Sequence, residues 1–186
     1  MPKIVKLAKV KENDIVKAIK QGKIIIYPTD TIYGIGCDAL NTESVMKIRM
    51  IKNREADKPF SVIAPSKQWI IKNFEVNPAY VEKLPGPFTF VLRTKKKLVS
   101  NNVTADVNIL GVRIPDHPFT KIIQKAGIPF ITTSVNQSGD QPISDIKKIP
   151  EKIAQQVDII IDAGLLNNRP STVIDLTGKI PRIIPR

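Results

Sequence analysis

A short apolar run that stops abruptly in a polar turn is the strongest constraint on the fold. The run covers Lys23 to Tyr27 and ends in Pro28-Thr29-Asp30-Thr31. It is continuous rather than alternating and rich in β-branched residues, which is typical of a strand covered on both faces. A glycine-rich bend, an amphipathic segment and a second apolar run, Phe60 to Ala64, follow. This alternation predicts an α/β protein with a largely parallel or mixed sheet.

The same alternation continues along the rest of the chain. We expect a helix that starts at Asn13 or Asp14 and ends at Gly22, and further helices over 41–51, 66–73, 78–83, 119–126 and 146–157. We expect strands over 23–27, 60–64, 88–93, 108–114, 129–133, 158–162, 172–176 and 182–184. The chain has 186 residues and shows no linker, repeat or low-complexity tract. One domain over residues 1–186 is therefore predicted.

Composition narrows the class of protein. The one cysteine, Cys37, rules out an internal disulfide and a cysteine-rich zinc site. The apolar runs are far shorter than the roughly 20 residues of a membrane span, so we expect a cytoplasmic protein without a membrane segment. A net charge of +12 favours an anionic partner such as a nucleotide, RNA or another polyphosphate. Lysine used simply as the default solvated side chain is the alternative explanation of the bulk charge.

Hydroxyls and cations gather where the predicted strands and helices end. Thr29 and Thr31 follow the first strand, at the edge where open α/β sheets bind ligands, although an ordinary polar turn favours the same residues. Lys52 and Arg54, followed by Lys58, suit a triphosphate. A solvated helix end with surface ion pairs is the alternative for these cations.

Three later segments repeat this pattern of polar residues beside apolar strands. Thr132 to Asn136 can contact a nucleotide, or can be a polar turn. Arg113 stands inside an apolar strand, where a charge is costly unless it is paired, so we expect it to meet a carboxylate from a ligand or from an internal aspartate. Ser171 again places a hydroxyl at the start of a strand.

Several kinds of site have no sequence signal. The single histidine, His117, lies between two prolines and is expected to cap a turn rather than act as a base. The sequence has no metal-ligand cluster, no G-x-S-x-G elbow and no Walker P-loop. Histidine-dependent hydrolase chemistry is therefore not expected, and any reaction would depend on positioning and on stabilisation of charge.

Six segments in order resemble the YrdC/TsaC family, the L-threonylcarbamoyladenylate synthases of tRNA t6A modification. They are PTDTIYGIGCDA, IKNREADKPFSV, LPGPFTFVL, GVRIPDHP, TTSVNQSGDQP and RPSTVIDLTG, and they cover nearly the whole chain. Asn53 and Leu84 depart from residues common in the family, without removing a charge or a hydroxyl. Because the chain stops at Arg186, the resemblance points to the short, single-domain form.

The resemblance implies a twisted mixed parallel and antiparallel sheet flanked by helices, with a basic concave cavity. It also implies a nucleotidyltransferase that converts L-threonine, bicarbonate and ATP to threonylcarbamoyl-AMP and pyrophosphate, for t6A at position 37 of ANN-decoding tRNAs. Thr31, Arg113, Thr132 and Ser171 would hold L-threonine, and Lys52, Arg54, Lys58, Ser134, Asn136, Pro142 and Arg186 would surround ATP. Lys52, Arg54, Ser134 and Asn136 would be the catalytic residues, and Mg²⁺ would arrive with ATP rather than at a protein metal site.

The resemblance also implies partners, and other interpretations remain. Longer members of the family carry an extra C-terminal domain. The short form is therefore expected to depend on partners, namely tRNA-modifying proteins that accept threonylcarbamoyl-AMP. The family's affinity for tRNA or double-stranded RNA makes a nucleic-acid-binding module one alternative, although aromatic residues are only 5% of the chain and base stacking is disfavoured. A carbamoyl-adenylate chemistry like that of hydrogenase-maturation proteins, and a regulatory nucleotide-binding protein without turnover, are the others.

Overall fold

The fold is a mixed sheet flanked by helices, seen here in a computed structural model that describes residues 1–104, 108–137 and 141–185. The strands are β1 (Lys3–Lys6), β2 (Ile25–Tyr27), β3 (Gly34–Gly36), β4 (Ser61–Ile63), β5 (Phe74–Glu75), β6 (Phe88–Thr94), β7 (Ile109–Arg113), β8 (Phe130–Ser134), β9 (Ile159–Asp162), β10 (Thr172–Asp175) and β11 (Arg182–Ile184). The α-helices are α1 (Glu12–Lys20), α2 (Thr42–Lys52), α3 (Lys67–Asn73), α4 (Pro78–Val81), α5 (Asn101–Thr104), α6 (Phe119–Ala126) and α7 (Glu151–Ala154), and short 3₁₀ turns cover Leu7–Lys9 and Ile146–Lys148.

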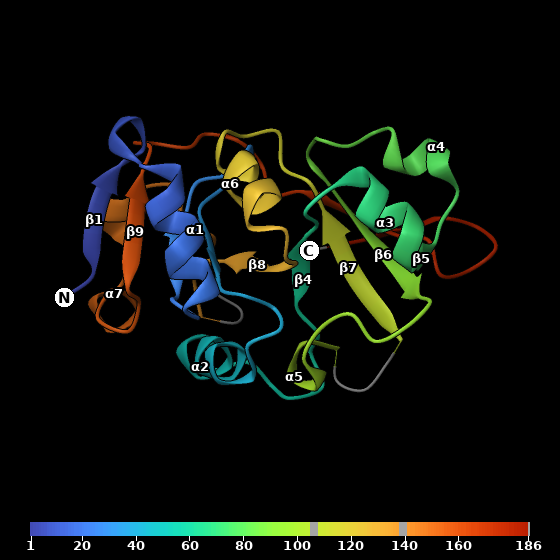
Figure 1. The fold of residues 1–186 in the computed structure, drawn as a ribbon, viewed down its shortest axis with the longest axis horizontal. Helices are drawn as coiled ribbons and strands as arrows, with labels where there is room; N and C mark the ends of the chain where they lie inside the picture. The colour runs from blue at the N-terminus through green and yellow to red at the C-terminus, as the bar shows by residue number, and fades with distance from the viewer. Residues whose placement is uncertain (105–107, 138–140, 186) are drawn as a thin grey trace.

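The strands form one continuous sheet that runs the length of the molecule and twists strongly along it (Figure 1). Its order is β1-β9-β2-β3-β8-β4-β7-β6-β10-β11, with β5 added beside β6. The sheet contains parallel pairs, such as β4 with β7, and antiparallel pairs, such as β4 with β8. The predicted mixed α/β fold is therefore confirmed.

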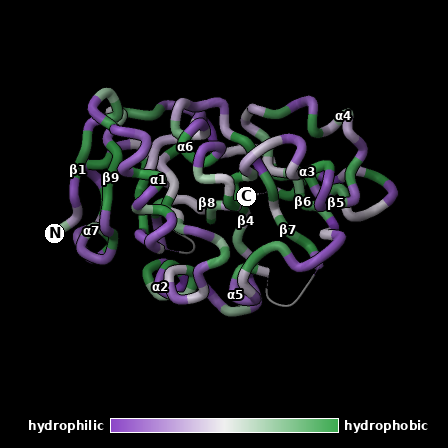
Figure 2. The backbone as a smooth tube through the Cα atoms, viewed as in Figure 1, coloured by the Kyte–Doolittle hydropathy of each residue, from purple (hydrophilic) through white to green (hydrophobic). Residues whose placement is uncertain are grey.

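Two hydrophobic clusters lie on opposite faces of this sheet. One includes side chains of α2, α3, α4 and α7. The other packs α1 and α6, which lie side by side (Figure 1), against Tyr27, Ile63 and Phe130. Hydrophobic residues accordingly gather on the central strands, and hydrophilic residues on the loops and outer helix faces (Figure 2). The part of the second face beyond α1 and α6 carries polar residues instead.

Register fixes which residues share that polar part of the face. Ser61 on β4 pairs with Gly111 on β7 and with Thr132 on β8. Directly paired residues lie on the same side of a sheet, and the period of two puts Arg113 there as well. Three neighbouring strands therefore present two hydroxyls, on β4 and β8, and the glycine and arginine of β7 to one common surface.

Some element boundaries differ from the predictions. Helix α1 begins at Glu12 with Lys11 as its extended N-cap, so Asn13 and Asp14 lie inside the first turn and do not cap it. The predicted helix 146–157 is broken into a 3₁₀ turn and the short α7, because Pro150 has no N–H to continue a helix and serves as the N-cap of α7. The predicted strand from Lys23 starts at Ile25, where ladder pairing begins.

Strands β1, β3 and β5 and the short α5 were not predicted. The glycine-rich bend is in fact β3, held between β2 and β8. A Cβ at Gly36 would lie 2.0 Å from the carbonyl oxygen of Ile131, and a Cβ at Gly34 would lie 2.8 Å from the Tyr27 ring. The glycines are therefore required by close approach of the neighbouring strands rather than by a turn.

Candidate functional site

Two adjoining cavities open on the polar part of the sheet face. The inner pocket, about 40 Å³, is lined by Thr29, Thr31, Ile32, Tyr33, Gly34, Ser61, Thr89, Arg113, Thr132, Thr133, Ser134 and Ser171. The outer cleft, about 550 Å³, is lined by Arg54, Pro59, Phe60, Ser61, Thr132, Thr133, Ser134, Asn136, Gln141, Pro142 and Pro170. Ser61, Thr132, Thr133 and Ser134 line both, so the two cavities meet at these residues.

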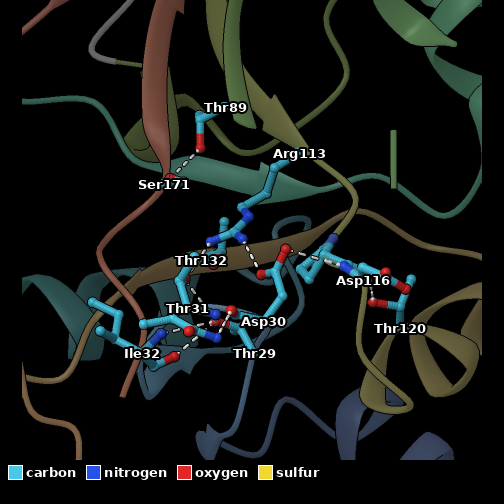
Figure 3. Close-up of polar contacts among 12 residues, drawn as sticks. Thr29, Asp30, Thr31, Ile32, Thr89, Arg113, Asp116, Thr120, Thr132 and Ser171 are labelled. Atoms are coloured by element: carbon cyan, nitrogen blue, oxygen red, sulfur yellow. Dashed lines mark hydrogen bonds and ion pairs between the residues drawn. The ribbon is translucent and has the colours of Figure 1, made fainter. Parts of the chain in front are cut away.

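Arg113 is the cation of the inner pocket. Its Nη2 lies 2.5 Å from Oδ1 of Asp30, and the two side chains are only 7% and 9% exposed (Figure 3). The internal aspartate that the sequence allowed for is therefore present. Burial lowers the pKa of Arg113, and the Asp30 carboxylate opposes that shift, so the guanidinium remains a cation.

The same guanidinium keeps donor capacity for a ligand. Its Nη1 reaches Oγ1 of Thr31 only at the long distance of 3.5 Å. Its Nε is buried and has no hydrogen-bond partner among the described residues. A buried N–H without an acceptor is costly, so this atom marks a position where a ligand oxygen is favoured.

Pairs of hydroxyls surround the arginine. Thr29 Oγ1 lies 2.9 Å from Thr31 Oγ1, and it also accepts from the Thr31 amide at 3.0 Å (Figure 3). Thr89 and Ser171 face each other with 2.9 Å between their oxygens. The buried Tyr27 hydroxyl donates to Oγ1 of Thr132 at 2.7 Å, and burial raises the pKa of Tyr27, which keeps it a donor. The hydrogen bonds of Thr29 thus hold the turn after β2 in place, and Thr31 in that turn lines the pocket.

The end of α2 meets the loop after β8 beside the outer cleft. Lys52, at the end of α2, is 2% exposed, and its Nζ donates to the carbonyl oxygens of Ser134 at 2.6 Å and of Asn136 at 2.7 Å. The Ser134 hydroxyl in turn donates to Oδ1 of Asn136. The alternative of a solvated helix end is wrong for Lys52, because the ammonium is buried and holds the loop after β8.

Arg54 is the cation of the outer cleft and is fixed by its own loop. Its Nη2 donates to the Pro59 carbonyl at 2.8 Å, and its guanidinium lies 5.1 Å from the centre of the Phe60 ring. Burial, and then the neighbouring Arg49, lower the pKa of Arg54. Arg49 donates to the Glu55 carbonyl at 2.6 Å and lies 4.9 Å from the same ring, so two arginines stack on Phe60.

The structure brings most of the predicted site residues together. Thr31, Arg113, Thr132 and Ser171 line the inner pocket, and Arg54, Ser134, Asn136 and Pro142 line the outer cleft. Lys58 lines neither cavity and forms an exposed ion pair with Glu55 at 2.7 Å, which agrees with the alternative of surface ion pairs for this cation. Arg186 lies outside the described residues. Thr133, part of the segment Thr132 to Asn136 that the sequence singled out, lines both cavities, whereas Ser61, Thr89 and Arg49 were missed.

Other predicted features can be placed as well. His117 Nδ1 accepts from the Phe119 amide at 3.1 Å, so the histidine side chain caps the turn that leads into α6, as predicted of a turn. In the described part of the chain, no three His, Cys, Asp or Glu residues group as a metal site would require. No helix within the same residues is long and apolar enough to cross a membrane. The strongly basic character expected of the cavity stays a prediction.

The fold and the two cavities define a class: a mixed α/β protein with a small pocket lined by an arginine and hydroxyls, which meets a larger cleft edged by a second arginine. Comparison with known proteins agrees. The family model of the Sua5/YciO/YrdC domain, described as "Telomere recombination", matches residues 17–186, and the chain belongs to this family.

Three relatives place the chain within that family. It is 32% identical over 179 residues to the threonylcarbamoyl-AMP synthase of Coxiella burnetii, covering 92% of this chain and 96% of that one. The structure of P. abyssi Sua5 complexed with L-threonine superposes with a TM-score of 0.84 at 28% identity, covering 98% of this chain and 56% of that one. The E. coli YciO structure gives a TM-score of 0.85 at 26% identity, covering 99% and 94%. The chain thus spans little more than half the length of the P. abyssi protein.

Proposed function

We propose that the chain is a threonylcarbamoyl-AMP synthase, which joins L-threonine, bicarbonate and ATP and releases pyrophosphate. The observation that carries the proposal is a buried arginine in a hydroxyl-lined pocket that opens directly into a larger cleft edged by a second arginine. The name of the Coxiella relative and the L-threonine complex of P. abyssi Sua5 support it. In this role the chain would supply t6A at position 37 of ANN-decoding tRNAs through proteins that accept the product.

L-threonine would occupy the inner pocket. Its α-carboxylate would accept from Nε of Arg113, the buried donor without a partner among the described residues. Thr31, Thr132 and Ser171 would surround the rest of the molecule with hydroxyls. Asp30 would hold the guanidinium in place from the other side, so the arginine need not reorganise when the ligand arrives.

MgATP would occupy the outer cleft. Arg54 and the loop Ser134–Asn136 would contact its phosphates, with the loop held from below by Lys52. The lining of the cleft contains no carboxylate among the described residues. We therefore treat Mg²⁺ as part of the MgATP substrate and assign it no protein ligands.

The reaction would take place where the two cavities meet. The threonine amine takes up the carbon of bicarbonate with loss of water and becomes a carbamate. A carbamate oxygen then attacks the α-phosphorus, forming an O–P bond as the P–O bond to the β-phosphate breaks and pyrophosphate leaves. No protein nucleophile is needed, so the protein contributes positioning and charge stabilisation, with a nucleotidyl group transferred.

Release of pyrophosphate tests the proposal. The purified chain is incubated with MgATP, L-threonine and bicarbonate, and pyrophosphate is counted with each component omitted in turn. We expect release that requires both L-threonine and bicarbonate. Release independent of both would contradict the proposal, as would no release from a chain that binds ATP and L-threonine. The second result would favour a nucleotide-binding protein without turnover.

A further inference from the structure

Ser61 stands at the junction of the two cavities and has no role in the assignments above. It lines both the inner pocket and the outer cleft. Along β4 it lies between Phe60, which stacks against Arg54, and Ile63, which pairs with Arg113. A ligand that extends from one arginine to the other therefore passes Ser61.

The space for the Ser61 hydroxyl is made by a glycine on the neighbouring strand. A Cβ at Gly111 would lie 2.3 Å from Ser61 Oγ and 3.0 Å from Ser61 Cβ. The Ser61 side chain thus occupies the place that a side chain at Gly111 would need. Glycine at 111 is required to keep the hydroxyl where it is, over β7 and on the polar face of the sheet.

The hydroxyl is also available to a ligand. Thr29, Thr31, Thr89 and Ser171 engage their hydroxyls with one another in pairs, and the Ser134 hydroxyl donates to Asn136. Ser61 Oγ makes no hydrogen bond to any described residue. Thr132, its direct partner on β8, accepts from Tyr27 and so retains its own hydrogen for donation.

We propose that Ser61 is a further catalytic residue, whose hydroxyl donates a hydrogen bond to the carbamate formed on the amino-acid amine. Paired residues of an antiparallel ladder have Cβ atoms about 4.5–5.5 Å apart, so Ser61 and Thr132 present two donors side by side. A carbamate has two oxygens and one negative charge. Its non-attacking oxygen accepts from these hydroxyls while the other oxygen attacks the α-phosphorus in the outer cleft.

This inference rests on the proposed function and is tested with three variants: Ser61→Ala, Ser61→Thr and Gly111→Ala. We expect Ser61→Ala to lower kcat about 10- to 100-fold, the range for a hydrogen bond to a charged group, and to raise the KM for bicarbonate. Stabilisation of the protein by L-threonine alone stays unchanged, because its carboxylate is held by Arg113. Ser61→Thr, which keeps the hydroxyl, retains most of the activity.

The Gly111→Ala variant tests the position of the Ser61 hydroxyl without replacing Ser61. Its Cβ displaces Ser61 Oγ, so we expect a loss of kcat similar to that of Ser61→Ala, and a much smaller further loss when the change is made in the Ser61→Ala background. Wild-type turnover with an unaffected Ser61→Ala variant would overturn the role of Ser61 and leave the proposed function intact. Absence of wild-type turnover would instead overturn the proposed function. Fully additive losses in the double variant would also overturn the role of Ser61.

Discussion

Lys52 Nζ lies 2.7 Å from the carbonyl oxygen of Asn136, which ties the end of α2 to the loop after β8. The sequence suggests Lys52 as a phosphate ligand, but its ammonium donates hydrogen bonds to backbone carbonyl oxygens of the protein. Lys52 would therefore act on a nucleotide in the outer cleft partly by holding Ser134 and Asn136 in position. This relationship leads to the first prediction.

Lys52→Met should lower both stability and activity. Loss of the ammonium leaves buried carbonyl oxygens without a donor, which costs about 1–3 kcal/mol of unfolding free energy. The free energy is measured by urea denaturation and the activity by pyrophosphate release. Lys47→Met, an exposed change on the same helix, serves as the control and should alter neither. A Lys52→Met protein as stable as the control would show that the buried contact contributes nothing.

Arg54→Ala should act mainly on the reaction. Loss of one preorganised charge-stabilising group costs on the order of 10²–10³ in rate. Arg54→Lys should recover only part of it, because lysine cannot reproduce the planar contacts with Phe60 and phosphate. Kinetics with MgATP varied are the measurement. Full activity of Arg54→Ala would remove Arg54 from the nucleotide site.

Arg113→Ala should abolish the response to L-threonine. In the wild type, L-threonine at about 100 times its Kd should stabilise the fold by about 2.7 kcal/mol, which a thermal shift detects. The variant should show no such shift. It should also be less stable by about 3–5 kcal/mol, since Asp30 is left as a buried charge without its partner. A normal threonine shift in the variant would contradict the assignment.

Stability should fall in mild acid through His117. Burial lowers the pKa of His117 below its ordinary value, opposed by Asp30 and then Asp116, so the unfolded chain binds the proton first as the pH falls. Stability is therefore present above the ordinary pKa of about 6.5 and is lost as the pH drops toward the lower folded value. Protonation of Nδ1 also removes the acceptor of the Phe119 amide.

His117→Asn checks this pH dependence. Asparagine can accept from the same backbone amide but does not titrate, so its urea midpoint should change less between about pH 7.5 and 5.5 than that of the wild type. Equal changes in the two proteins would assign the acid sensitivity to other groups.

Gly36→Ala should destabilise the centre of the sheet. The added Cβ would lie 2.0 Å from the Ile131 carbonyl oxygen, a backbone atom that can move only with β8. Such overpacking costs about 1–3 kcal/mol or more in the free energy of unfolding. Gly178→Ala, where the nearest atom is 3.7 Å away, is the matched control and should be nearly neutral. Equal midpoints in urea for the two variants would contradict the close approach of β3 and β8.

Much of the fold follows from apolar runs because a strand covered on both faces leaves a continuous signal. Ile25–Tyr27 and Ser61–Ile63 were predicted in this way, within one or two residues. Gly34–Gly36 was read as a bend because glycine has low strand propensity. Only the neighbouring backbone of Ile131 and the ring of Tyr27 explain why glycine is needed there, and sequence alone does not show those neighbours.

The sequence predicts many of the residues that line the two cavities, and the roles assigned to them stay predictions. An unpaired charge buried in an apolar strand costs free energy, so the sequence predicts a partner for Arg113. Asp30 is that partner. Ser61 gives no such signal, since a single serine in an apolar strand is common, and only the structure shows that it lines both cavities. Strand alternation puts Ser61 on the same face as Ile63, which packs among the hydrophobic residues under α1 and α6. The alternation therefore gives no reason to expect a polar site at Ser61.

The most direct test of the central proposal is the identity of the product. The chain is incubated with MgATP, L-threonine and ¹³C-labelled bicarbonate, and the nucleotides formed are analysed by mass spectrometry. We predict threonylcarbamoyl-AMP that carries the label in its carbamoyl carbon and is absent when L-threonine is omitted. An unlabelled adenylate, or ATP hydrolysis to AMP without any threonine-containing nucleotide, would contradict the assignment.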